Sequence, residues 1–93
     1  MEEKERNMGD DKMNNDLISN LDEIHSTELG VERIRKNLEL KTDNVIGWCV
    51  KKIKQADWIT RKGKNWYVYV ANSIITINAH SYTIITAHKS RGE

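Results

Sequence analysis

The chain has 93 residues, of which 38% are hydrophobic and 31% are charged, and its formal net charge is +1 at pH 7. This length suits one small domain. No apolar run approaches the roughly 18 residues of a membrane helix, so we expect a cytoplasmic protein without a membrane partner. The lone Cys49 excludes an internal disulfide, and the histidines lack a recognised metal-ligand spacing, so we expect no metal and no cofactor.

Charge is distributed unevenly along the chain. Residues 1–16 contain six acidic and three basic residues, whereas residues 51–93 contain eight basic residues against Asp57 and Glu93. A cationic C-terminal half permits a polyanionic partner. Residues 1–14 show no apolar periodicity, and we expect them to form a disordered leader to a single α+β domain over residues 15–93.

Three amphipathic segments follow the leader, each with apolar residues at the spacings of three and four that are typical of a helix packed on one side. The three stripes consist of Leu17, Ile18, Leu21 and Ile24; of Val31, Ile34 and Leu38; and of Val45, Ile46, Cys49, Val50 and Ile53. Either Ser26 or Thr27 can cap the start of the second helix, and Thr42 and Asp43 repeat this capping signal before the third. We expect the first helix to run from Asp16 to near His25.

After Ala56 the hydrophobic period changes to two, which predicts strands. Runs of β-branched and aromatic residues cover residues 58–62, 65–70, 74–78 and 81 or 82 to 88. Small polar residues between them predict turns at 63–64, 72–73 and 79–80. The predicted fold is therefore α+β, with three N-terminal helices packed on one face of a four-stranded antiparallel β-meander.

Turns centred on Ala71 with Asn72 and on Ala79 with His80 would assign the two faces of the predicted sheet, because facing residues in a hairpin lie on the same side. The core face consists of Trp66, Val68, Val70, Ile75, Ile77, Tyr82 and Ile84. The opposite face consists of Tyr67, Tyr69, Ile74, Thr76, Asn78, Thr83 and Ile85. This second set is too apolar for a bare surface and too polar for a core, which makes it a candidate interaction surface.

Basic and aromatic residues alternate around the first predicted hairpin. Single-stranded nucleic acid is typically bound by cations along its phosphates and by rings that stack on its bases. The candidate binding residues are Arg61, Lys62, Lys64, Tyr67 and Tyr69. We expect a non-enzymatic binding domain with RNA or single-stranded nucleic acid as its partner. One alternative is a protein-interaction module, such as a homodimer that buries the second face of the sheet. A purely structural alternative is that the lysines only discourage edge-to-edge aggregation of sheets.

The histidines suggest a further alternative, a metal-independent ribonuclease of the toxin type. A neutral histidine can take the proton of a 2′-hydroxyl group, and a cation can stabilise the phosphorane. The candidate catalytic residues are His80 or His88, with Lys62 or Arg61 as the cation. Exposed polar positions at strand ends are the simpler explanation of both histidines, and the sequence does not show whether they converge.

Four segments carry a family resemblance: IHSTELGVERIRKNL at 24–38, WC at 48–49, RKGKNWYV at 61–68 and ITINAHSYTIITAHK at 75–89. They resemble a family of small bacterial proteins, the domain of unknown function DUF3781, which implies a shared fold without an established activity. The order of elements and the ending Thr86, Ala87, His88 are more loosely similar to the barnase-like and RelE-like ribonuclease and toxin fold. The sheet lacks the clear catalytic glutamate of that fold.

Overall fold

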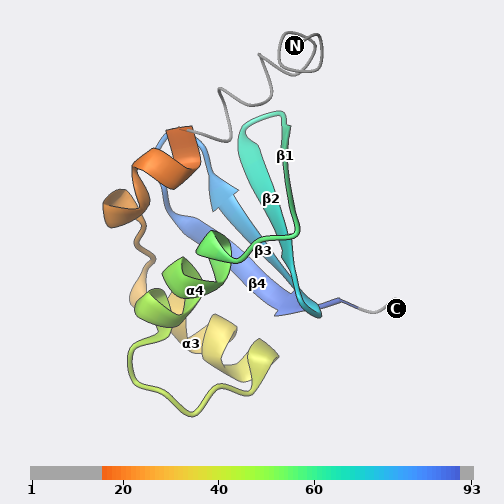
Figure 1. The fold of residues 1–93 in the computed structure, drawn as a ribbon. Coiled ribbons are helices and arrows are strands. Elements are labelled where there is room, and N and C mark those ends of the chain that lie inside the picture. Colours follow the sequence, from red (N-terminus) through yellow and green to blue (C-terminus); the bar gives the residue numbers. More distant parts are fainter. Residues whose placement is uncertain (1–15, 91–93) are drawn as a thin grey trace, which may run out of the picture.

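The computed structural model describes residues 16–90, so the predicted leader over residues 1–14 lies outside the described residues. Helical elements come first, followed by a sheet (Figure 1). In chain order they are η1 (Leu21–Glu23), α3 (Glu28–Leu38), α4 (Val45–Lys54), β1 (Trp58–Lys62), β2 (Asn65–Val70), β3 (Ser73–Asn78) and β4 (Ile84–Lys89). The predicted α+β class is confirmed.

The first predicted helix is interrupted. Residues 16–19 are helical, Asn20 has a non-helical backbone with φ −124° and ψ 35°, and the short 3-10 helix η1 follows. Leu17 and Ile24 are nevertheless almost completely buried. The stripe therefore packs as its spacing predicts, although the helix is not continuous.

The helix α3 begins at its predicted cap. Thr27 Oγ1 accepts a hydrogen bond from the backbone N–H of Gly30 at 2.9 Å, which satisfies one of the unpaired donors of the first turn. Ile34 and Leu38 are buried, and Val31 is half-buried. The apolar seam predicted from the sequence is the side of α3 that enters the core.

The N-cap of α4 lies one residue after the predicted capping residues Thr42 and Asp43. Asn44 is the N-cap, and its Oδ1 accepts from the backbone N–H of Gly47 at 3.0 Å. A β-carbon at Gly47 would lie 2.3 Å from Asn44 Nδ2. The glycine therefore makes room for the capping side chain.

The four strands form one antiparallel sheet in the order β1-β2-β3-β4, which is the predicted meander. Gly63 and Ala71 have φ values of 59° and 53° in the first two turns. The third connection is longer than predicted, and β4 begins only at Ile84. Tyr82 in this loop has φ 61° and donates its N–H to Asn78 O at 2.8 Å.

The core lies between the helices and one face of the sheet (Figure 1). The buried side chains on that face are Trp66, Val68, Val70, Ile75, Ile77, Ile84 and Ala87. Tyr82 is only half-buried, and its ring lies 5.3 Å from that of Trp66. The predicted core face is thus buried except for Tyr82, which lies in the loop before β4.

Residues of the N-terminal part cover the outer edge of β4. His25 forms a parallel β-bridge with Thr83. Two side-chain donors satisfy carbonyl groups of the strand: Ser26 Oγ donates to Ile84 O at 3.0 Å, and Asn37 Nδ2 donates to Ala87 O at 3.2 Å. These contacts attach α3 and the segment before it to the last strand.

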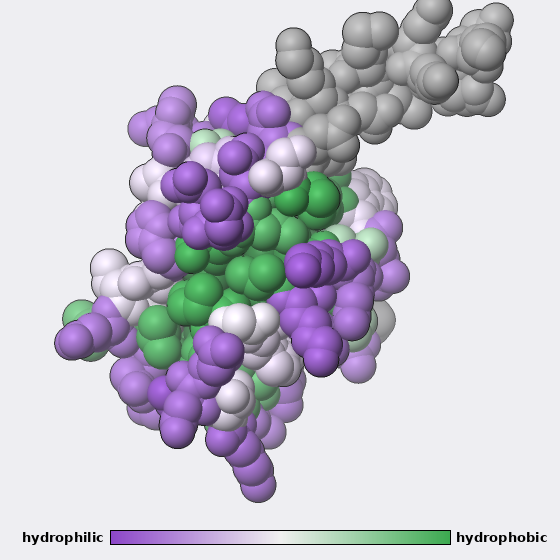
Figure 2. Space-filling view, turned by 60° about the vertical axis from the view of Figure 1, so that its left-hand side comes forward, coloured by the Kyte–Doolittle hydropathy of each residue, from purple (hydrophilic) through white to green (hydrophobic). Residues whose placement is uncertain are grey.

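The helix side of the molecule carries a band of hydrophobic surface between hydrophilic margins (Figure 2). Half-buried helical residues that pack against the core supply apolar surface on this side: Leu21, Val31, Ile46 and Val50. Within residues 16–90, no helix is long and apolar enough to cross a membrane.

Candidate functional site

The second face of the sheet has no covering element among the described residues, because α3 and α4 pack on the first (Figure 1). Cross-strand pairing arranges its side chains in three rows that run across the strands. The aromatic row is Trp58, Tyr69, Ile74 and His88; the hydroxyl row is Thr60, Tyr67, Thr76 and Thr86; the polar row is Lys62, Asn65 and Asn78. We call this surface the open face.

Two aromatic rings lie exposed in the aromatic row. The centroids of the Trp58 and Tyr69 rings are 5.8 Å apart, and their planes meet at 47°. Trp58 is 64% exposed and Tyr69 is 38% exposed. Since large aromatic side chains are usually more buried than this, the pair is a surface on which a planar ligand could stack.

The hydroxyl row is recessed. Thr76, at its centre, is only 7% exposed, although no described element covers the open face. The larger side chains of Ile74 and Asn78 precede and follow it on the same face of β3, and Tyr67 lies opposite it on β2. The side chain of Thr76 is therefore largely covered by its neighbours on the sheet, whereas Thr60 and Thr86 at the ends of the row are half-buried.

The structure divides the five predicted binding residues. Tyr67, Tyr69 and Lys62 lie on the open face, and Lys64 lies at the turn beside it. Arg61 alternates with Lys62 and points to the helix side. Its guanidinium group lies 5.7 Å from the centre of the Trp66 ring, and its Nε donates to Gly63 O at 3.0 Å.

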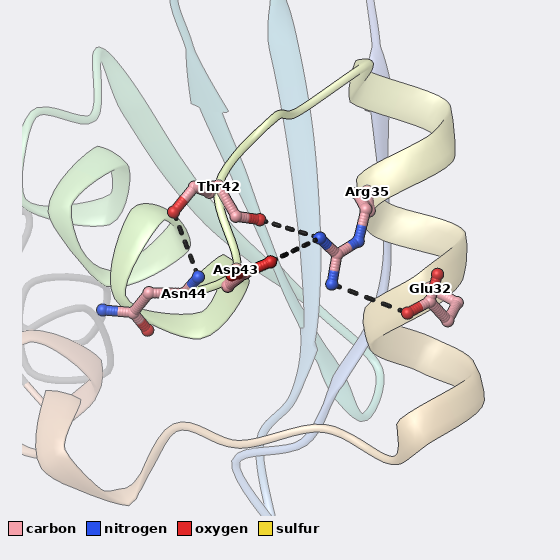
Figure 3. A network of polar contacts seen from close by, with 5 residues as sticks. All are labelled: Glu32, Arg35, Thr42, Asp43 and Asn44. Atoms are coloured by element: carbon pink, nitrogen blue, oxygen red, sulfur yellow. Dashed lines mark hydrogen bonds and ion pairs between the residues drawn. The ribbon is translucent and has the colours of Figure 1, made fainter.

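Arg35 serves the structure of the helical layer (Figure 3). Its Nη1 donates to Thr42 O at 2.9 Å and lies 3.5 Å from a carboxylate oxygen of Asp43. Its Nη2 lies 3.5 Å from a carboxylate oxygen of Glu32. The guanidinium group thus joins α3 to the loop before α4, and its charge is balanced within the fold.

Lys62 and Lys64 differ from such paired cations. Lys89 Nζ lies 3.1 Å from a carboxylate oxygen of Glu39, whereas neither Lys62 nor Lys64 forms an ion pair within residues 16–90. Both lysines are exposed, at the β1–β2 turn. They are therefore free to contact an anionic ligand at this end of the open face.

The two histidines of the ribonuclease hypothesis are not brought together. His88 lies in the aromatic row opposite Ile74. His80 lies in the loop after β3, six residues beyond Ile74, which corresponds to roughly 20 Å along an extended strand. A mechanism that uses both histidines as an acid and base pair is not supported by this geometry, and a role for either one alone stays a prediction.

A third histidine, His25, occupies a hydrogen-bonded site. His25 Nδ1 donates to Glu23 O at 2.9 Å, and its Nε2 lies 3.0 Å from Thr83 Oγ1. Thr83 Oγ1 in turn lies 2.7 Å from Ser81 Oγ. His25 and Thr83 are 58 positions apart in the sequence, so no local sequence signal could have predicted their contact.

Other chemically reactive groups lie away from the open face. Cys49 is buried in α4, and burial raises the pKa of its thiol to about 12, so the reactive thiolate is disfavoured. A cleft of about 400 Å³ on the helix side is lined by Ser26, Glu28, Val31 and Glu32. Its two carboxylates disfavour a polyanionic ligand there. Within residues 16–90, no three potential ligand side chains cluster as a metal site requires.

The fold and the open face define a two-layer α+β domain with one sheet face left uncovered by the described elements. A protein-family model described as "Protein of unknown function (DUF3781)" matches residues 18–88, so the chain belongs to this family. The family resemblance of its sequence segments is therefore confirmed. No curated protein and no solved structure matches the chain. The similarity to barnase-like and RelE-like toxins stays a prediction.

Proposed function

We propose that this protein is a non-enzymatic cytoplasmic domain that binds single-stranded nucleic acid through its open face. The exposed Trp58–Tyr69 pair on the uncovered side of the sheet is the observation that carries the proposal. Stacking of a base on an aromatic side chain contributes about 1–3 kcal/mol and tolerates every base. The surface therefore suits recognition of unpaired nucleotides with little sequence preference.

The free cations support the same ligand. Lys62 belongs to the polar row, and Lys64 follows at the adjacent turn. Phosphate groups of a bound nucleic-acid strand that runs across the sheet would contact these two lysines. The lysines lie at the end of the open face opposite the exposed ring pair. Arg61 is not part of this contact, because its side chain lies over Trp66 on the helix side.

The test is a titration of a labelled single-stranded oligonucleotide over a range of salt concentrations. We expect the affinity to fall with salt, with a logarithmic slope of about −0.7 for each phosphate contact. The double variant Lys62→Gln, Lys64→Gln should therefore weaken the slope by about 1.4. The matched control is Lys36→Gln, Lys54→Gln, which removes the same charge from exposed positions in α3 and α4. Absence of binding at low salt, or binding that is indifferent to salt, would refute the proposal.

A homodimer that buries the open face is the second candidate. Its support is the exposed apolar area of the open face, where Trp58 and Tyr69 are 64% and 38% exposed. Light scattering coupled to size-exclusion chromatography over a range of concentrations distinguishes the two candidates. A monomer throughout contradicts the dimer, whereas a dimer that Trp58→Ala dissociates supports it.

A further inference from the structure

The hydroxyl groups of the hydroxyl row are not used by the fold. Elsewhere, Ser26 Oγ donates to a strand carbonyl group, and Thr27 and Thr42 accept from backbone N–H groups at helix starts. In contrast, the side chains of the hydroxyl row form no hydrogen bond within residues 16–90. A line of unused donors and acceptors across the open face is suited to a ligand that carries its own hydroxyl groups.

The spacing of the three rows matches the parts of a nucleotide. Successive residues on one face of a strand are about 7 Å apart, and adjacent strands are about 4.8 Å apart. A base on the aromatic row therefore places its sugar over the hydroxyl row. Its phosphate then lies toward the polar row, where Lys62 is located. The protein thus presents aromatic rings, hydroxyl groups and a cation in the same order in which base, ribose and phosphate follow one another in a nucleotide.

We propose that the hydroxyl row binds ribose 2′-hydroxyl groups, so that the ligand is RNA and not DNA. This inference rests on the proposed function and names its substrate class. A threonine hydroxyl group both donates and accepts, as a 2′-hydroxyl group does, and the 2′-hydroxyl group is the feature that distinguishes the two nucleic acids at a given site. Thr60 and Thr86 are half-buried at the two ends of the row, where a ligand can reach them.

The experiment compares oligouridine with oligodeoxyuridine of the same length in an anisotropy titration. These ligands differ only in the 2′-hydroxyl groups. We expect the wild-type protein to bind the ribose strand more tightly, by about threefold to tenfold for each hydroxyl contact. Thr60→Val and Thr86→Val should remove this preference. The matched control Thr60→Ser keeps the hydroxyl group and should keep the preference.

The outcomes separate this inference from the function on which it rests. Salt-sensitive binding with equal affinity for both strands overturns the ribose inference and leaves the proposed function intact. Failure to bind either strand overturns both. A strand of 2′-O-methyluridine tests the same contact without changing the protein, and it should bind the wild-type protein as weakly as the deoxyribose strand does. Unchanged affinity for the methylated strand would contradict donation from the ribose to the hydroxyl row.

Discussion

Replacement of Trp58 and of Trp66 by alanine should separate binding from stability, because the two rings lie on opposite faces of the sheet. Trp58 is 64% exposed and contacts Tyr69, so its loss removes little more than one aromatic pair, about 1 kcal/mol of unfolding free energy. Trp66 is 2% exposed in the core, and its truncation costs about 3–5 kcal/mol. The total stability of a domain is about 5–15 kcal/mol, so only the second variant endangers the fold.

The affinity for single-stranded nucleic acid should show the opposite order. Trp58→Ala removes a stacking surface and should weaken binding about 5-fold to 150-fold, which corresponds to about 1–3 kcal/mol. Thermal unfolding followed by circular dichroism gives the stabilities, and anisotropy titration gives the affinities. A Trp58→Ala protein that is folded and binds as tightly as the wild type would refute the role of the open face. A Trp58→Ala protein that loses as much stability as Trp66→Ala would contradict its exposed position.

Three further predictions concern single residues. Thr83→Val removes the hydroxyl group that lies 3.0 Å from His25 Nε2, and it should lower the free energy of unfolding, measured by urea titration, by about 1 kcal/mol. The control Thr86→Val removes a hydroxyl group without a hydrogen bond among the described residues and should change this free energy by less than about 0.5 kcal/mol. Gly63→Ala should destabilise the protein by about 1–2 kcal/mol from backbone strain alone, because φ is 59° and no atom lies within 4 Å of the added carbon; an unchanged melting temperature would contradict this turn. The pKa of Cys49 is raised from 9.0 to about 12, so above pH 9 the unfolded state loses a proton that the folded state keeps, and the stability should fall as pH rises from about 9 toward about 12. This fall should be absent in Cys49→Ala.

Periodicity predicted the elements of this fold well where each residue had one dominant local preference. The cap at Thr27, the seam through Ile34 and Leu38, and the alternation through β2 are confirmed because local hydrogen bonding and burial favour the same arrangement. The first helix was predicted too long, because periodicity does not detect the non-helical backbone at Asn20. The start of β4 was predicted too early, because an aromatic residue in the sequence does not indicate the left-handed backbone that Tyr82 adopts.

The open face was only partly predictable from the sequence. Alternation correctly placed Tyr67 and Tyr69 opposite the core, and the structure pairs Tyr69 with Trp58 on the adjacent strand. Adjacency in sequence grouped Arg61 with Lys62, although neighbouring residues in a strand point to opposite faces. A strict use of the period of two would have separated them. The site formed by His25 and Thr83 depends on tertiary structure and has no counterpart in local sequence.

The covered edge of β4 has a consequence for how the chain folds. His25, Ser26 and Asn37 complete their hydrogen bonds with partners that follow them by 50 to 58 residues. During synthesis these residues leave the ribosome well before β4, and α3 lacks its main strand partner until residues 84–89 have emerged. Contacts of such long sequence separation slow folding, since the loop must close before they form. We expect the apolar side of α3 to stay exposed through most of translation, and a chain that stops after β3 to require a chaperone or to aggregate.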